Sequence, residues 1–178
     1  MIYLKYSLLV VCSLLADLLN FVVAPVVVLF ASKEGWLPRW LRWFQTPDNS
    51  LDGDGGWKAE NRPFMNESNG LKRWWNRTSW LYRNSMYGFA IDVLGARLDV
   101  EDVIEIEGNA RVSNRPLLNG LVVRRVRRGG KLAYFQWYYV KAWSGTRCVR
   151  INLGWKLWGK QPSFQLVFSI NPFMGYSA

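Results

Sequence analysis

Residues 7–31 read SLLVVCSLLADLLNFVVAPVVVLFA, an almost unbroken apolar run of 25 residues. A helix of that length measures about 37 Å, more than the roughly 30 Å of hydrocarbon in a bilayer. A surface helix of a soluble protein alternates between polar and apolar faces, whereas this run is apolar all round. It is also longer than the apolar core of a cleavable signal peptide. The run therefore predicts an N-terminal transmembrane helix, with residues 1–32 as a retained membrane anchor.

Charged residues on either side of the run predict its orientation. Lys5 is the only basic side chain before it, whereas Lys33, Arg39 and Arg42 follow it closely. Positive residues near a membrane span stay in the cytoplasm. We therefore expect the N-terminus outside and the C-terminal domain in the cytoplasm.

Three residues interrupt the apolar run: Asp17, Asn20 and Pro25. A charged side chain inside a bilayer costs about 2.5–3.5 kcal/mol on insertion scales unless it is paired. One interpretation places Asp17 and Asn20, the intramembrane polar residues, at a homo-oligomer interface formed by the anchor. The alternative breaks the run into a re-entrant hairpin of two short arms. The single span is favoured, and both interpretations remain open.

The chain has a net charge of +10 and 16% aromatic residues, including 11 Trp. Because the anchor holds one Lys and one Asp, all of this net charge belongs to the part after Ser32. A basic domain beside a bilayer meets anionic phospholipid first, and each Lys or Arg at that surface gains about 1 kcal/mol. Nucleic acid is the rival partner for such charge and is not favoured. The chain lacks His, the commonest metal ligand and general base near neutral pH.

Residues 36–44, WLPRWLRWF, predict a short amphipathic helix with Pro38 in its first turn. The aromatic side chains recur at helical spacing, which suits a helix lying in the membrane interface with guanidinium groups at the phosphates. The alternative is a core helix of a soluble domain. The predicted membrane-interface residues are Trp36, Arg39, Trp40, Arg42, Trp43 and Phe44.

An oxygen-rich loop follows at residues 46–57, TPDNSLDGDGGW. Asp48, Asp52 and Asp54 are its candidate metal ligands, for a divalent cation. Ala59 stands where an EF-hand loop that begins at Asp48 requires Glu, so a structural, glycine-rich turn is the favoured interpretation. No other cofactor is expected.

Three segments resemble an uncharacterised family of membrane proteins from tailed bacteriophages. They are LPRWLRWFQTPDNSLDGDGGW (37–57), WLYRNSMYGFAIDVLG (80–95) and GWKLWGKQPSFQLVFSINPF (154–173), which together make up about a third of the chain. The resemblance implies a phage origin and residence in the inner membrane of the bacterial host. It implies no activity.

Residues 71–94 predict a helix that is interrupted near Asn84 and Ser85. Its expected buried stripe consists of Leu71, Trp74, Trp75, Thr78, Leu81 and Tyr82. Basic residues surround the stripe, so the helix is expected to pack on the domain with its basic face at the headgroups. The alternative is an aromatic and basic surface that stacks the bases of single-stranded nucleic acid.

From Arg97 onward the apolar period changes to two, which is typical of half-buried strands. Strands are expected at 103–107, 121–128, 132–143, 148–157 and 164–170, with Gly129–Gly130 and Ser144–Gly145 as tight turns. The expected fold class is therefore α+β. It combines the transmembrane helix, short interfacial helices and the Asp/Gly loop in residues 33–95, and an antiparallel β meander in residues 96–178 that forms a half-barrel or small barrel.

The densest basic cluster lies at the turn between two of these strands. Its predicted anion-binding residues are Arg124, Arg125, Arg127, Arg128 and Lys131. The alternative is pairing with an acidic strand that carries Glu101, Asp102, Glu105 and Glu107. Opposite charges that face each other across a sheet contribute roughly 0.2–1 kcal/mol.

The sequence contains no nucleophile elbow and no glycine-rich phosphate-binding pattern. We therefore expect a non-enzymatic inner-membrane protein whose basic β-rich domain binds anionic phospholipid and a host membrane protein. Superinfection exclusion or host takeover is the role that the phage resemblance implies. The alternatives are a metal-assisted enzyme that acts on lipid headgroups, a membrane-tethered nucleic-acid binder, and a virion or lysis component.

Overall fold

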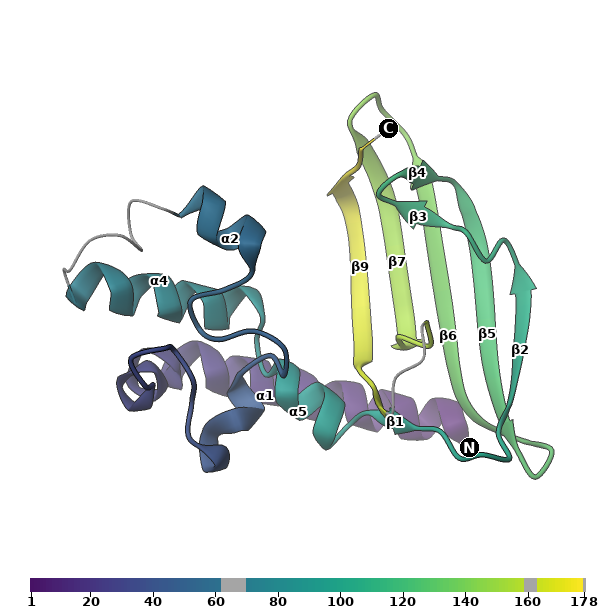
Figure 1. Cartoon of the computed structure of the whole chain (residues 1–178). Helices are drawn as coiled ribbons and strands as arrows, with labels where there is room; N and C mark the ends of the chain where they lie inside the picture. The colour runs from purple at the N-terminus through teal and green to yellow at the C-terminus, as the bar shows by residue number, and fades with distance from the viewer. Residues whose placement is uncertain (62–69, 159–162, 178) are drawn as a thin grey trace. The chain divides into compact units, whose positions relative to one another are not determined.

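The computed structural model describes residues 1–61, 70–158 and 163–177 (Figure 1). It contains a long apolar N-terminal helix, short helices and an antiparallel sheet, which confirms the predicted α+β class. The chain divides into two compact units. The β unit consists of Met1–Val10 and Gly95–Ala178, and the helical unit consists of Val11–Leu94. The predicted boundary after residue 95 lies beside this division, whereas the predicted anchor is shared between the two units.

The apolar run forms one continuous helix. α1 covers Ile2–Val27 and passes directly into the 3₁₀ helix η1, Val28–Phe30. Pro25 lies inside α1 without ending it, although its missing N–H leaves one helical hydrogen bond unmade. The alternative of a re-entrant hairpin is therefore wrong. Among the described residues, α1 with η1 is the one helix long and apolar enough to cross a membrane.

Five antiparallel strands form the main sheet of the β unit, in the order β2-β5-β6-β7-β9 (Figure 1). They are β2 (Val103–Gly108), β5 (Gly120–Arg128), β6 (Lys131–Ala142), β7 (Arg147–Trp155) and β9 (Leu166–Gly175). Two short pairs join β1 (Ala96–Arg97) to β8 (Ser163–Phe164) and β3 (Ser113–Asn114) to β4 (Leu117–Leu118). Within the described part of the chain β2 and β9 remain outer edges, so the predicted meander is an open sheet and not a closed barrel.

Turn and edge chemistry set the ends of these strands. Gly129 and Gly130 join β5 to β6 with φ of 54° and 75°, which favours glycine and matches the twist of a two-residue hairpin. β9 continues through Asn171 and Pro172, past its predicted end. Pro172 is tolerated because β9 is an edge strand, and the register with β7 shifts at this place.

The first residues of α1 pack on one face of the sheet. The Tyr6 hydroxyl donates to the carbonyl oxygen of Val167 at 2.8 Å, and its ring meets the Phe135 ring edge-on at 5.1 Å. The Tyr3 ring lies 4.9 Å from the same Phe135 ring. The N-terminal residues and the β domain therefore form one compact unit. The predicted orientation in a membrane stays a prediction.

The opposite face of the sheet carries a buried core. Successive strand residues point to opposite faces, so the side chains of Phe135 and Tyr138 lie on different sides of β6. The core consists of Val112, Val122, Tyr138, Val140 and Cys148. Part of it comes from the segment between β2 and β5, which brings Val112 over this face.

In the helical unit, α4 (Gly70–Arg83) runs beside the C-terminal part of α1 (Figure 1). The Trp74 indole N–H donates to the carbonyl oxygen of Pro25 at 2.7 Å. The remaining elements are η2 (Arg39–Phe44), α2 (Gly55–Glu60) and α5 (Tyr87–Asp92). The core consists of Ala24, Val27, Val28, Leu41, Leu51, Trp80 and Leu81.

α4 docks with most of the predicted stripe, because Thr78 and Leu81 are buried and Trp74 and Tyr82 pack against the core of the helical unit. The other two stripe residues, Leu71 and Trp75, are 70% and 52% exposed. Arg77, which the pattern assigns to the outer face, is buried instead. The predicted interruption at Asn84 is confirmed, because α4 ends just before it.

Candidate functional site

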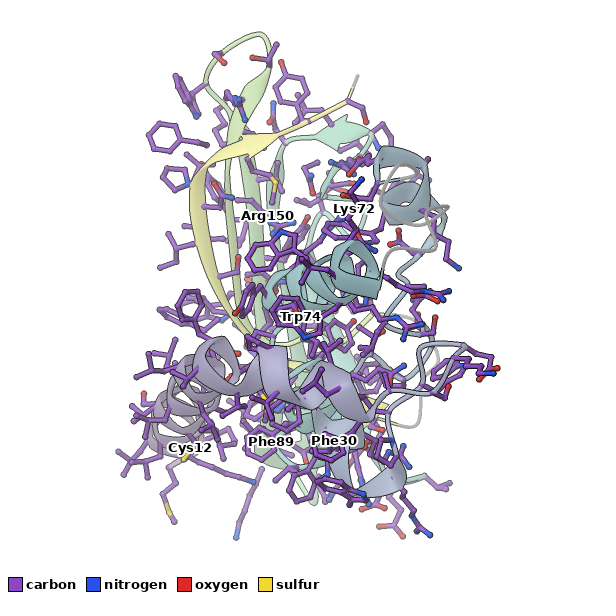
Figure 2. All side chains as sticks on the ribbon, turned by 90° about the vertical axis from the view of Figure 1, so that its left-hand side faces the viewer. Cys12, Phe30, Lys72, Trp74, Phe89 and Arg150 are labelled. Carbon is purple, nitrogen blue, oxygen red and sulfur yellow. The ribbon has the colours of Figure 1, made fainter. Side chains whose placement is uncertain are left out.

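An apolar stripe runs along the exposed side of α1 and η1. It consists of Leu4, Leu8, Val11, Leu15, Leu18, Val22, Val26 and Leu29, which are 54–70% exposed. Spacings of three and four residues place them on one face of the helix. Cys12 is exposed as well and points outward in Figure 2. A soluble monomer rarely leaves an apolar patch of this length in water, so the stripe is a candidate contact surface.

The collar, residues 36–44, follows α1 and contains η2. A 3₁₀ helix has three residues per turn, so Leu41 and Phe44 share its inner side, where they pack with the core of the helical unit. Trp40 and Trp43 share the outer side and are 66% and 48% exposed. Phe44 therefore faces the core and is not available to a membrane, whereas the exposed tryptophans remain candidates for membrane contact.

A cavity of about 300 Å³ opens between η2 and α5. Trp36, Arg39, Arg42, Gly88 and Asp92 are among its lining residues. Arg42 forms an ion pair with Asp92 at 3.5 Å, and no described carboxylate pairs with Arg39. Gly88 permits this close packing, because a Cβ there would lie 2.5 Å from the carbonyl oxygen of Arg42. Two guanidinium groups and an indole around one cavity suit a phosphate group at a membrane interface.

The side chain of Arg77 organises the loop that the sequence offered as a metal site. Arg77 donates from Nε to Asp52 Oδ1 at 2.7 Å and from Nη2 to Asp52 Oδ2 at 3.2 Å. It also donates to the carbonyl oxygens of Ser32 and Lys33 at 3.1 and 2.8 Å. Arg73 adds a longer ion pair to Asp52 at 3.8 Å. Both oxygens of the Asp52 carboxylate are therefore already occupied.

The two other candidate ligands, Asp48 and Asp54, lie apart from this pair. Asp54 accepts a hydrogen bond from the backbone N–H of Trp57 at 2.8 Å and so caps α2, and Asp48 is exposed. In the part of the chain that the structure describes, no three His, Cys, Asp or Glu side chains gather where they could hold a metal ion. The predicted cation site is thus not assembled, and the loop acts as a structural turn.

The polar residues of the anchor face other elements of the helical unit. The buried Asn20 amide donates to the carbonyl oxygen of Leu81 at 3.1 Å and to the Ser85 hydroxyl at 3.0 Å. Leu81 lies in the last turn of α4, where carbonyl groups lack helical partners, so Asn20 caps that helix. Asp17 interacts with the same Ser85 hydroxyl. An oligomer through the anchor stays a prediction, but these two side chains already make contacts within the chain.

The predicted anion-binding cluster is divided between the two faces of the sheet. Its ion pairs are Arg125–Glu107 (2.7 Å), Arg127–Glu105 (2.7 Å), Arg128–Asp102 (2.6 Å) and Arg128–Asp99 (3.0 Å). The hydrogen bonds from Arg128 lower the pKa of Asp102 to about 2. Arg124 points to the covered face, and Lys131 is exposed at the start of β6. Pairing with the acidic segment therefore accounts for three arginines, and the five residues do not form one site.

Sequence reasoning missed a polar row inside the β unit. Arg124 Nη1 donates to Gln136 Oε1 at 3.2 Å, and Gln136 Nε2 donates to Asn152 Oδ1 at 3.0 Å. All three side chains are buried. Polar residues at inward-facing strand positions are the signal that would have revealed it, because buried polar groups need partners.

One family model matches the chain over residues 1–178. The chain belongs to the family of unknown function DUF7338. No curated protein and no solved structure matches it significantly. Membership in DUF7338 brings no activity, ligand or source with it, so the bacteriophage resemblance stays a prediction.

Proposed function

We propose that the protein is a non-enzymatic binding protein that lies on one leaflet of an anionic membrane. α1 rests in the plane of the interface, with its apolar stripe in the hydrocarbon and the collar among the headgroups. The observation that carries this proposal is the stripe itself, eight Leu and Val side chains that are each more than half exposed. Burial of each such side chain contributes on the order of 1 kcal/mol, enough together for firm membrane binding.

The packing of the first ten residues supports a helix in the membrane plane over a crossing helix. Because Met1–Val10 and Gly95–Ala178 form one unit, the segment between them crosses a bilayer an even number of times or not at all. α1 with η1 is the single candidate span among the described residues. α4 carries four basic residues, too many for a second span. A helix that lies in the interface agrees with both constraints.

The collar supports anionic phospholipid as the ligand of this surface. Arg39 and Arg42 are exposed beside three exposed tryptophans, and both line the cavity between η2 and α5. Indole rings favour the headgroup region, and each arginine gains about 1 kcal/mol near an anionic surface. We assign the lipid phosphate to this cavity.

The alternative functions have less support. Asp48, Asp52 and Asp54 do not converge on a cation, and three arginines of the basic cluster already bind carboxylates. A phage origin, the host inner membrane with the domain in the cytoplasm, and capture of a host membrane protein in superinfection exclusion or host takeover stay predictions from sequence resemblance.

The depth of α1 in lipid tests the proposal. In a Cys12→Ser background, a nitroxide is attached to single cysteines at Leu4, Val11, Leu18 or Leu29, and its accessibility to oxygen and to a water-soluble nickel complex is measured in anionic nanodiscs. Cys148 needs no replacement because it is fully buried. A helix in the interface gives nearly the same depth at all four positions.

A crossing helix gives a different profile, with the greatest depth at Leu18 and shallow values at Leu4 and Leu29. That profile would overturn the proposal. A label at the exposed Arg115 of the β unit serves as the water-accessible reference.

Vesicle flotation tests the collar separately. We expect Arg39→Gln/Arg42→Gln to reduce the preference for anionic over zwitterionic vesicles by up to about 30-fold, which corresponds to about 1 kcal/mol for each charge. The matched control, Arg111→Gln/Arg115→Gln, removes the same charge from exposed positions of the β unit. Equal losses from both pairs would mean that net charge alone, and not the collar, selects the lipid.

A further inference from the structure

We propose that the β unit contains a second binding site, for a small phosphate monoester that carries a flat apolar group, in the cavity beside Arg124. This cavity measures about 300 Å³. Its lining residues are Ala110, Val112, Ser113, Arg124, Tyr138 and Trp158. The site lies within the β unit and does not depend on the membrane proposal.

Among the residues that the structure describes, Arg124 has no acidic partner for its buried charge. It is only 8% exposed. Its described contacts are neutral: Nη1 donates to Gln136 Oε1 at 3.2 Å, and Nη2 makes a long hydrogen bond to the carbonyl oxygen of Ala110 at 3.4 Å. The next residue, Arg125, has Glu107 at 2.7 Å. A buried guanidinium without a counter-charge is unfavourable, so a bound anion would complete the site.

A further positive group, Arg150, lies near Tyr138, one of the residues that line the cavity. Arg150 (labelled in Figure 2) pairs with Val140 of β6 and so shares the face of Tyr138, and its buried Nε has no hydrogen-bond partner in the described structure. Burial raises the pKa of Tyr138, and the nearby charge of Arg150 partly offsets this rise. Burial, followed by the charge of Arg150, lowers the pKa of Lys156 to about 8. Together with Arg124, the nearby Arg150 creates a positive potential that favours a dianion.

The cavity walls indicate the rest of the ligand. A guanidinium fork matches the geometry of phosphate oxygens. The Trp158 ring packs edge-on against Tyr138 at 5.4 Å, and Val112 lies beside them, which gives a flat apolar group a matching wall. Ligand cavities begin at roughly 300 Å³, so this one suits a small molecule.

Phenyl phosphate is the probe, titrated calorimetrically into the full chain in zwitterionic nanodiscs. We expect binding to the wild type, with inorganic phosphate weaker because it lacks the ring. Arg124→Gln should weaken phenyl phosphate at least tenfold, whereas Arg125→Gln, which removes the same charge from the other face, should leave its affinity unchanged. Equal affinity in Arg124→Gln, or no binding to the wild type at about 10 mM, overturns the proposal.

Two further measurements separate binding from folding and identify the source of the phosphate. Without ligand, Arg124→Gln should keep or raise the unfolding midpoint, because it removes an uncompensated buried charge. If this variant fails to fold, Trp158→Ala serves as the test. It should weaken the binding of phenyl phosphate but not that of inorganic phosphate. An unchanged affinity for phenyl phosphate overturns the proposal. Weaker binding of phenyl phosphate in anionic nanodiscs would identify a lipid headgroup as a competing ligand. Unchanged binding would identify the natural ligand as a soluble molecule.

Discussion

Arg77 and Asp52 form a bidentate ion pair within the helical unit, with side chains only 8% and 11% exposed. Arg77 belongs to α4, and Asp52 to the loop between η2 and α2. The carbonyl oxygens of Ser32 and Lys33, just after η1, accept further hydrogen bonds from the same guanidinium. Gly35 leaves room for it, because a Cβ there would lie 3.2 Å from Arg77 Nη2. One arginine therefore joins three separate segments of the chain.

Removal of either partner of this ion pair should destabilise the helical unit. We expect Asp52→Ala to lower the free energy of unfolding by about 3–5 kcal/mol, because a buried guanidinium is left uncompensated. The double variant Asp52→Leu/Arg77→Met should recover much of that loss. Chemical denaturation of the full chain in detergent micelles measures both.

Two results would contradict this role. The losses of Asp52→Leu and Arg77→Met, measured singly, would add up in the double variant if the two side chains acted independently. An increase in stability on addition of Ca²⁺ or Mg²⁺ would mean that Asp52 binds a cation after all. We expect no such increase, because Arg77 occupies both carboxylate oxygens.

Gly88 should tolerate no side chain, because α5 packs so closely on η2. A Cβ would lie 2.5 Å from the carbonyl oxygen of Arg42 and 2.8 Å from that of Gln45. We expect Gly88→Ala to destabilise the protein by about 1–3 kcal/mol and to weaken the binding of anionic vesicles, since it moves a wall of the collar cavity. The control is Gly55→Ala in α2, where nothing lies within 4 Å and alanine favours the helix. Equal stability of the two variants would contradict the close packing.

The buried amine of Lys156 predicts a rise in stability at alkaline pH. Burial lowers its pKa from 10.5 to about 8. Between these two values the unfolded chain binds more protons than the folded chain, so the free energy of unfolding increases with pH across that window. We expect a gain on the order of 1–2 kcal/mol, allowing for partial exposure. Lys156→Met should remove the slope and stabilise the protein near neutral pH, and a slope that persists in this variant would belong to another group.

The strands of the β unit were predictable because their signals are local. Val149, Ile151 and Leu153 alternate with more polar neighbours, and β7 covers all three. The hairpin at Gly129–Gly130 follows from two residues that accept positive φ. The full length of β9 could not be predicted, because Pro172 is acceptable only on an edge strand, and the edge is a property of the assembled sheet.

The candidate sites were harder to predict because they depend on distant partners. The apolar periodicity of the helix predicts that Arg77 faces water. Arg77 is buried instead, because it pairs with Asp52, which lies 25 residues away in sequence. Arg124 and Arg125 are identical neighbours in the sequence, yet one is buried beside neutral groups and the other is paired with Glu107. Strand alternation separates them, and only the register shows which face is covered.

By itself the sequence determined that the N-terminal segment is an apolar helix and that the second half forms antiparallel strands, because periodicity and turn chemistry depend on adjacent residues. Only the tertiary structure decided that Tyr3 and Tyr6 dock on the sheet and so place the N-terminus with the β domain. It also decided which arginines are neutralised, and that Arg124 is buried without an acidic partner among the described residues. The reason is physical: burial and counter-charge come from segments that meet only when the chain folds.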